Sequence, residues 1–281
     1  MSRPWILLCP SSRGIGHALT RHLLRSTDSS IPIFATSRSS DTAAAKKKLL
    51  HGLDDGKTSA MAKRLEVVQL DVTDESSVSA AAHHAASLFP HSSHHLHLAF
   101  ALPGILHPEK SPAQVDYGRA LETFRVNALG PLLLMKWFEE FLPRKSTQFH
   151  LDDQSGGGSD GNMSLPSHAV WVSMSARVGS VSDNKLGGWY SYRSSKAAVN
   201  SLTKSFDYQL HTRSGDKAMA VAYHPGTVKT DLSKAFWGSV ANDRLFEPED
   251  AVDKMARLVM AGLGVDKRGR CWDYNGDEVP P

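Results

Sequence analysis

The sequence has little of three features that mark specialised classes of protein. It has only two cysteines, Cys9 and Cys271, both in apolar runs, so buried free thiols are favoured over a disulfide. Its longest apolar runs, Trp5–Cys9 and Pro131–Met135, are far shorter than the roughly 20 residues needed to cross a bilayer. No signal-peptide layout opens the chain, because the glycine-bearing segment Arg13–Gly16 follows at once. We therefore expect a cytoplasmic protein without a membrane partner.

Charge of one sign is also scarce. The formal net charge is only +3, from 32 Lys plus Arg and 29 Asp plus Glu. Such a small excess, without long basic runs, argues against a dedicated nucleic-acid-binding protein. The 41% hydrophobic and 22% charged residues are typical of a soluble globular protein. With no internal repeat, residues 1–281 are expected to form one domain.

Short apolar runs alternate with helix-length segments along the chain. The runs are mostly continuous in their hydrophobicity, as in strands that are covered on both faces. The expected strands are Trp5–Cys9, Pro32–Ser37, Leu65–Val72, Leu96–Leu102, Ala169–Met174, Met219–His224 and Cys271–Tyr274. The expected helices are 14–26, 40–52, 75–88, 112–141, 190–212 and 248–262. This order predicts a Rossmann-like, doubly wound α/β fold, with a seven-stranded, mostly parallel sheet and helices on both faces.

Two segments interrupt this alternation. Residues 144–167 are rich in Gly, Ser and Asp without apolar periodicity, which predicts a flexible surface insertion. Residues 226–247 follow the sixth expected strand and carry Phe236, Trp237 and Phe246. A long aromatic loop at the carboxyl end of a strand is expected to act as a lid over a substrate site, although packing on a neighbouring element remains an alternative.

The first expected strand runs into a glycine turn that opens the first helix. In a βαβ unit, such a turn directs backbone N–H groups and the positive helix end toward a pyrophosphate. Glycine is needed where a Cβ would block the approach of backbone to phosphate. The turn comprises Ser11, Ser12, Arg13, Gly14, Ile15 and Gly16.

The second expected strand ends in Ser37-Arg38, where a dinucleotide fold meets the adenosine ribose. An acidic residue here would accept the ribose 2′-hydroxyl, but the sequence has none. Arg38 and Arg13 instead suit the 2′-phosphate of NADP(H). Two solvated surface arginines are the alternative interpretation.

Tyr192 and Lys196 stand four residues apart near the start of an expected helix, which places them on one helix face. A free tyrosine has a pKa near ~10, and a neighbouring cation stabilises the phenolate. The pair is therefore expected to exchange a proton at neutral pH.

With this motif, the chain resembles the short-chain dehydrogenase/reductase family nearly end to end. The segment Gly187–Asn200 is especially similar to the carbonyl-reductase-like branch related to C-factor proteins. The resemblance implies reversible, NADPH-dependent reduction of a ketone or aldehyde, with Tyr192 as general acid or base and Lys196 on the nicotinamide ribose. It also implies a homodimer or homotetramer, with a small carbonyl or alcohol compound as substrate.

Further site residues follow from the same resemblance. Asn127 matches the asparagine whose backbone holds a water in the proton relay. Ser175 is the preferred serine for the substrate oxygen and Ser173 the weaker candidate, because Ala176 stands where the family often has its catalytic serine. Beyond the glycine turn, Arg38, Tyr192 and Lys196, the implied coenzyme residues are Asp71, Val72, Gly104, Pro225, Gly226, Val228 and Thr230.

Two departures from the family pattern favour a second function. Cys9-Pro10 replaces Thr-Gly at the start of the turn, and proline has no N–H to donate. The segment Ala101–Gly104 replaces Asn-Asn-Ala-Gly and lacks both asparagines. The alternative is an NADP(H)-binding sensor or scaffold with little turnover.

A cluster of histidines raises the question of a metal site. The cluster comprises His91, His94, His95 and His97. No acidic or thiolate residues accompany it, so a solvated polar loop is expected and no metal is assigned.

Overall fold

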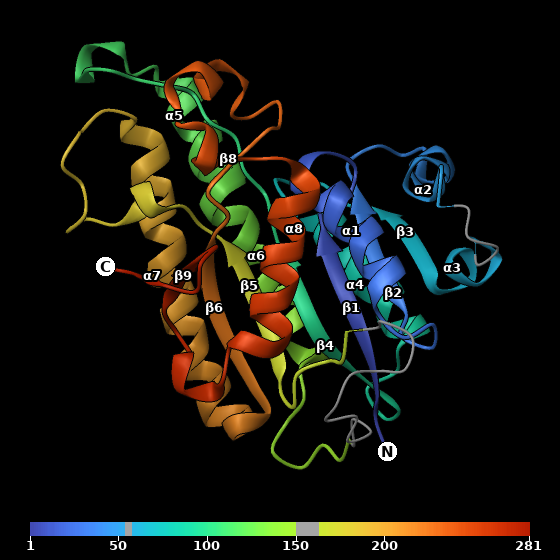
Figure 1. Ribbon diagram of the computed structural model, residues 1–281. Coiled ribbons are helices and arrows are strands. Elements are labelled where there is room, and N and C mark those ends of the chain that lie inside the picture. Colours follow the sequence, from blue (N-terminus) through green and yellow to red (C-terminus); the bar gives the residue numbers. More distant parts are fainter. Residues whose placement is uncertain (54–57, 150–162) are drawn as a thin grey trace.

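A computed structural model describes residues 1–53, 58–149 and 163–281 (Figure 1). Its main sheet has the strand order β10-β9-β6-β5-β4-β1-β2-β3. These strands are β1 (Arg3–Cys9), β2 (Ile33–Ser37), β3 (Leu65–Gln69), β4 (His94–Ala101), β5 (Ala169–Met174), β6 (Ala218–His224), β9 (Cys271–Asp273) and β10 (Glu278–Val279). The order runs outward in both directions from β1 and β4, so the predicted doubly wound, mostly parallel sheet is confirmed.

The sheet has eight strands where the sequence predicted seven. The additional strand, β10, pairs antiparallel with β9, placing Glu278 opposite Trp272 and Val279 opposite Cys271. With two residues, β10 is too short for hydrophobic periodicity to reveal it.

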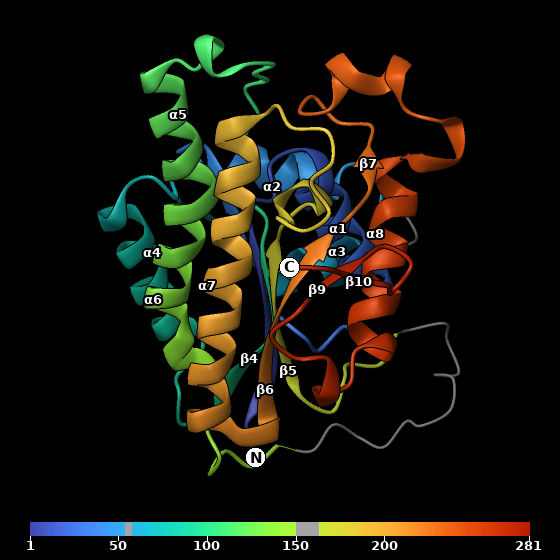
Figure 2. The same cartoon turned by 90° about the vertical axis from the view of Figure 1, so that its left-hand side faces the viewer.

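Helices cover both faces of the sheet (Figure 2). The apolar side chains of α1, α2, α3 and α8 join the core on one face, and those of α4, α6 and α7 join the core on the other. The bounds are α1 (Gly14–Ser26), α2 (Thr42–Leu50), α3 (Thr58–Arg64), α4 (Glu75–Leu88), α5 (Tyr117–Phe124), α6 (Gly130–Phe138), α7 (Tyr190–Ser214) and α8 (Pro248–Arg257). Within the described ranges, no helix is long and apolar enough to span a membrane.

The long helix predicted over 112–141 is interrupted. A π-helical segment, Arg125–Leu129, separates α5 from α6. Pro131 stands in the first turn of α6 and has no N–H for an intrahelical bond. Single π-turns inside helices are frequent at functional sites. Helix α3 was not predicted, because its seven residues carry too few turns to show periodicity.

The prediction of a solvated histidine loop is wrong, because three of the four histidines lie in a strand and two of these are buried. Strand β4 begins at His94, so His95 and His97 lie in the strand and are 1% and 0% exposed. The two rings are joined by a 3.0 Å hydrogen bond, His95 Nδ1 contacts Ser2 Oγ at 3.0 Å, and His97 Nε2 donates to Pro166 O at 2.8 Å. These bonds satisfy both rings inside the protein.

The centre of the predicted insertion, 150–162, lies outside the described residues, so its flexibility stays a prediction. The described ends of the segment are anchored. Lys217 Nζ donates to the carbonyl oxygens of Lys145 and Thr147, both at 2.7 Å, and Met163 N donates to Ser26 O at 2.6 Å.

The loop over residues 226–247 is tied together at its base. Strand β7 (Thr227–Val228) pairs in parallel with β8 (Leu245–Phe246). Between these strands lie two 3₁₀ segments, Lys234–Ser239 and Asn242–Arg244. The loop therefore has regular structure of its own at the carboxyl end of β6.

Candidate functional site

The predicted coenzyme residues gather at one edge of the sheet. Parallel neighbouring strands end at the same edge, and each of β1, β2, β3, β4 and β6 is followed there by members of the set. The members are Ser11–Gly16 after β1, Arg38 after β2, Asp71 and Val72 after β3, Gly104 after β4, and Pro225, Gly226, Val228 and Thr230 after β6.

The glycine turn has the close packing expected of a phosphate cradle. Gly14 has a φ of +54°, and a Cβ on Gly16 would lie 1.9 Å from Pro10 O. Helix α1 receives no side-chain cap at its first residues, which leaves N–H groups of its first turn for an anion. Ser11 uses both of its hydrogen-bond donors inside the protein, because its N–H donates to Thr36 O and its hydroxyl donates to Leu8 O. The turn fits a pyrophosphate through the residues after Ser11.

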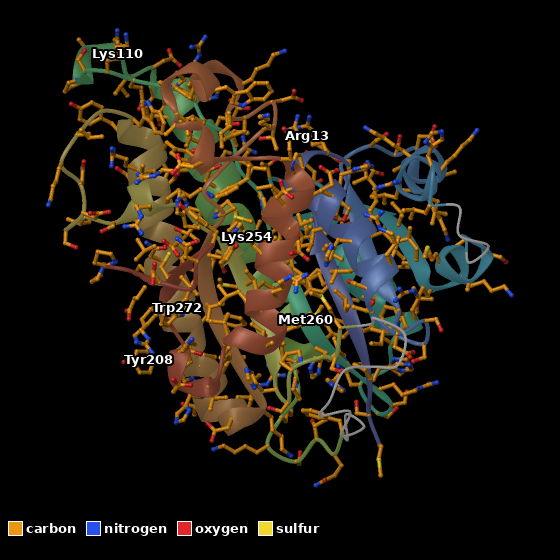
Figure 3. All side chains as sticks on the ribbon, viewed as in Figure 1. Arg13, Lys110, Tyr208, Lys254, Met260 and Trp272 are labelled. Carbon is orange, nitrogen blue, oxygen red and sulfur yellow. The ribbon has the colours of Figure 1, made fainter. Side chains whose placement is uncertain are left out.

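Two cations stand beside this turn. Arg13 precedes α1 and lies at the upper end of the sheet in Figure 3, and Arg38 directly follows β2, the neighbour of β1. Both side chains are exposed, and neither forms an ion pair within the described part of the chain. Both are therefore free to hold a phosphate.

The ends of β3 and β4 are braced locally. Asp71 Oδ1 accepts hydrogen bonds from Thr73 N at 2.9 Å and Thr73 Oγ1 at 2.8 Å. Leu102 N donates to Cys9 O at 2.7 Å, so a main-chain bond joins the ends of β4 and β1 where the family asparagines are missing.

The loop after β6 reaches back to the glycine turn. A Cβ on Gly14 would lie 3.4 Å from Thr230 Cγ2, which places these two segments in contact. Gly104 is similarly close to the helix of the Tyr–Lys motif, since its Cβ would lie 3.8 Å from Lys196 Nζ and 3.7 Å from Leu232 Cδ1. The glycine turn, Gly104, Thr230 and Lys196 thus belong to one continuous site.

Tyr192 and Lys196 share one face of α7, as their spacing predicted. Lys196 Nζ lies 5.8 Å from the centre of the Tyr192 ring and donates to Met174 O at 2.7 Å. Burial raises the pKa of Tyr192 to about 12 and lowers the pKa of Lys196 to about 8. Desolvation therefore raises the phenol pKa where the sequence predicted a lowering, and the phenol is protonated at neutral pH.

Asn127 lies in the π-helical segment and contacts α7. Its Oδ1 accepts from Ile105 N at 2.8 Å, and its Nδ2 donates to Ile105 O at 2.9 Å and to Ser195 Oγ at 3.0 Å. Ser195 in turn donates to Tyr192 O at 2.8 Å. The sequence analysis did not single out Ser195, although it directly precedes Lys196 in the same motif.

The candidate serines occupy different surroundings. Ser175 is 2% exposed and its hydroxyl donates to Asn200 Oδ1 at 2.6 Å, one turn beyond Lys196 on α7. Ser173 is fully buried, and its hydroxyl has no hydrogen-bond partner among the described residues. Both hydroxyls therefore face the interior.

Aromatic side chains stand beside the phenol. The Trp189 ring lies 6.1 Å from the Tyr192 ring and 4.8 Å from the Phe236 ring, so the 226–247 loop meets the start of α7 here. Within the described ranges, no group of three or more His, Cys, Asp or Glu side chains is placed to hold a metal ion.

Comparison with known proteins shows which proteins the chain is similar to. No protein-family model matches the chain. The chain is 33% identical to C-signal of Myxococcus xanthus over 166 residues, which cover 59% of this chain and 81% of C-signal. It is 28% identical to 1-hydroxy-2-glutathionyl-2-methyl-3-butene dehydrogenase of Rhodococcus sp. (strain AD45) over 233 residues, 83% of this chain and 81% of that relative. The NADPH-bound carbonyl reductase from chicken fatty liver matches over 100% of both chains, with a TM-score of 0.76 and 25% identity.

The fold and the site define an α/β oxidoreductase of the dinucleotide-binding class. Within that class, the chain belongs to the short-chain dehydrogenase/reductase family, in the carbonyl-reductase-like branch related to C-factor proteins.

Proposed function

We propose that this protein is an NADPH-dependent reductase of ketones or aldehydes that also runs toward alcohol oxidation. The observation that carries the proposal is the placement of Tyr192 and Lys196 on one face of α7, with Lys196 beside Gly104 at the edge that holds the glycine turn. NADP(H) is the coenzyme, because Arg13 and Arg38 are exposed and unpaired within the described chain and no acid occupies the end of β2.

The coenzyme, when bound, supplies the hydride for the carbonyl carbon. The N–H groups at the start of α1 hold its pyrophosphate, and Asp71 and Val72 line its adenine end. Pro225, Gly226, Val228 and Thr230 are assigned to its nicotinamide end, because Leu232 of the same loop lies beside Gly104, the neighbour of Lys196.

Tyr192 Oη delivers a proton to the substrate oxygen during reduction. A phenol with a pKa of about 12 carries this proton at neutral pH, which is the state that a general acid needs. Lys196 is charged at neutral pH and stabilises the phenolate that remains. Asn127 holds the start of α7 through Ser195, and its main chain is assigned to the relay water by the family resemblance.

The remaining predictions complete this proposal. Residues 1–281 form one domain, and the 226–247 loop covers the substrate with Phe236 against Trp189. Ser175 remains the candidate that hydrogen-bonds the substrate oxygen. Its hydroxyl must first break its hydrogen bond to Asn200 Oδ1. Homodimer or homotetramer assembly is part of the same proposal.

Replacement of Tyr192 by Phe tests the proton donor. The general acid contributes roughly 10² to 10⁴ in rate, so kcat should fall by that factor while the NADPH dissociation constant stays the same. Tyr190→Phe is the matched control, because Tyr190 lies on the same helical turn and is 41% exposed. Full turnover of the Tyr192→Phe variant would contradict the assignment.

A coenzyme-binding sensor or scaffold is the second candidate. It is favoured by one observation, namely that Ser175 is already bonded to Asn200 while Ala176 holds the position of the family's usual serine. A fluorescence titration with NADPH separates the two functions. Tight binding without oxidation by a broad panel of carbonyl compounds supports the sensor, whereas turnover supports the reductase.

A further inference from the structure

Helix α7 lacks a cap of its own where it begins. Its first residue follows Trp189, which adopts a left-handed conformation with a φ of 50° and provides no side-chain hydrogen bond to the helix. Trp189 is the one residue other than glycine with positive φ in the described chain. The two preceding residues, Gly187 and Gly188, also have positive φ. Such backbone strain persists only where surrounding contacts hold it.

Glu109 provides the missing contacts from a distant part of the chain. Its carboxylate accepts hydrogen bonds from Ser191 N at 2.9 Å and from Ser191 Oγ at 2.5 Å. Its main-chain oxygen accepts from Trp189 N at 2.6 Å. One residue therefore binds two backbone N–H groups, those of Trp189 and Ser191, at the first turn of α7.

The chemistry of this contact favours a carboxylate. The first N–H groups of a helix have no intrahelical partner, and the helix dipole places positive potential at the same end. Glu109 is only 4% exposed, so its charge is separated from water and relies on these two donors. Its neighbour Lys110 is exposed and projects from the upper end of the molecule in Figure 3.

The hydrogen bonds of Glu109, which we call the clamp, lie next to two aromatic rings of the site, those of Trp189 and Tyr192. Trp189, held through its N–H, lies 6.1 Å from the Tyr192 ring and 4.8 Å from the Phe236 ring. Ser191, held through its N–H and hydroxyl, directly precedes Tyr192. The loop that carries Glu109 also carries Gly104, next to Lys196. A shift of this loop would therefore move the phenol relative to the lysine and to the substrate.

We propose that Glu109 is a positioning residue for catalysis, which clamps the start of α7 so that Tyr192 and Trp189 meet the substrate carbonyl in a fixed geometry. This inference rests on the proposed reductase function. It assigns no chemical step to Glu109, which touches Trp189 and Ser191 rather than the reacting atoms.

The test compares Glu109→Ala, Glu109→Gln and Ser191→Ala in the full chain. Glu109→Ala should lower kcat by about 100-fold, as expected for a misplacement near 1 Å, and leave the NADPH dissociation constant unchanged. Glu109→Gln keeps the length and one acceptor oxygen, so it should recover part of the lost kcat. Ser191→Ala keeps the N–H bond and should have the mildest effect. Glu122→Gln is the matched control, because this carboxylate is 60% exposed and contacts His107 at the surface.

Hydrogen exchange of the Ser191 amide gives a readout that is independent of turnover. Exchange should be faster in Glu109→Ala than in the wild type, and unchanged exchange would overturn the clamp. Faster exchange with normal kcat would leave Glu109 as a structural cap and overturn the positioning role. If Glu109→Ala does not fold, a kcat of Glu109→Gln equal to wild type also overturns it. If the wild-type protein binds NADPH but has no activity, the reductase function is rejected instead. The exchange result would still decide whether Glu109 holds α7.

Discussion

Lys196 Nζ donates a 2.7 Å hydrogen bond to Met174 O, so the ammonium of α7 is tied to the carboxyl end of β5. Lys196 is 1% exposed, and among the described residues this main-chain oxygen is the acceptor that takes the place of the water around a surface lysine. The protein thereby keeps a cation beside the phenol at the cost of a lower pKa.

The pKa of Lys196 predicts an alkaline limit to reduction. Burial lowers this pKa to about 8, and an amine is charged below its pKa. As the pH rises through about 8, Lys196 loses its charge. The plot of log kcat against pH should then fall with the slope that the loss of one proton gives. A pH profile of kcat measures this. Lys204→Met, which removes a lysine farther along α7, should keep the same profile, and a constant kcat up to pH ~10 would contradict the assignment.

Coenzyme preference should depend on Arg38. Arg38→Asp places an acid where the ribose 2′-hydroxyl would lie and repels a 2′-phosphate. The ratio of Michaelis constants for NADPH and NADH should therefore change in favour of NADH. Arg25→Asp changes the same charge at the far end of α1 and serves as the control. An NADPH preference that is unchanged in Arg38→Asp would refute the contact.

Gly16 should tolerate no side chain. Its Cβ would lie 1.9 Å from Pro10 O, a backbone atom, so Gly16→Ala must displace the turn between β1 and α1. NADPH affinity should fall at least tenfold, which corresponds to about 1.4 kcal/mol. Gly238→Ala is the control, because its Cβ would meet no atom within 4 Å. Equal NADPH dissociation constants for the two variants would exclude a role for the turn.

The buried histidine pair predicts sensitivity to acid. Burial lowers the pKa of His95 to about 4 and that of His97 to about 3. Below pH ~6.5 the unfolded chain takes up protons that the folded protein does not, so the free energy of unfolding should decrease toward pH 4. The decrease is about 1.4 kcal/mol per pH unit for each histidine.

Denaturation curves measured between pH 7 and pH 4 test this pair. His97→Gln keeps a hydrogen-bonding side chain without a titrating ring, so its stability should decline less steeply with acid. His107→Gln, at a partly exposed histidine, should follow the wild type. Identical slopes for His97→Gln and the wild type would show that the pair does not titrate as inferred.

The order of strands and helices was accessible from the sequence because each buried strand is a continuous apolar run. The sequence also placed Tyr192 and Lys196 on one face, because a spacing of four is local to a helix. It did not reveal β10, α3 or the π-turn around Asn127, which depend on short segments and on packing. It also treated His95 and His97 as part of a solvated polar cluster, since a polar composition does not show that two rings can satisfy each other inside a sheet.

The sequence by itself therefore determined the doubly wound fold, the glycine turn and the Tyr–Lys pair, since these follow from hydrophobic pattern, from glycines between a strand and a helix, and from helical periodicity. Only the tertiary structure decided the pKa of the phenol, because this pKa depends on burial by residues that are far apart in the chain. It likewise decided that Glu109, 82 residues before Ser191, caps the helix that carries the phenol. Contacts over such a separation leave no periodic signal in the sequence.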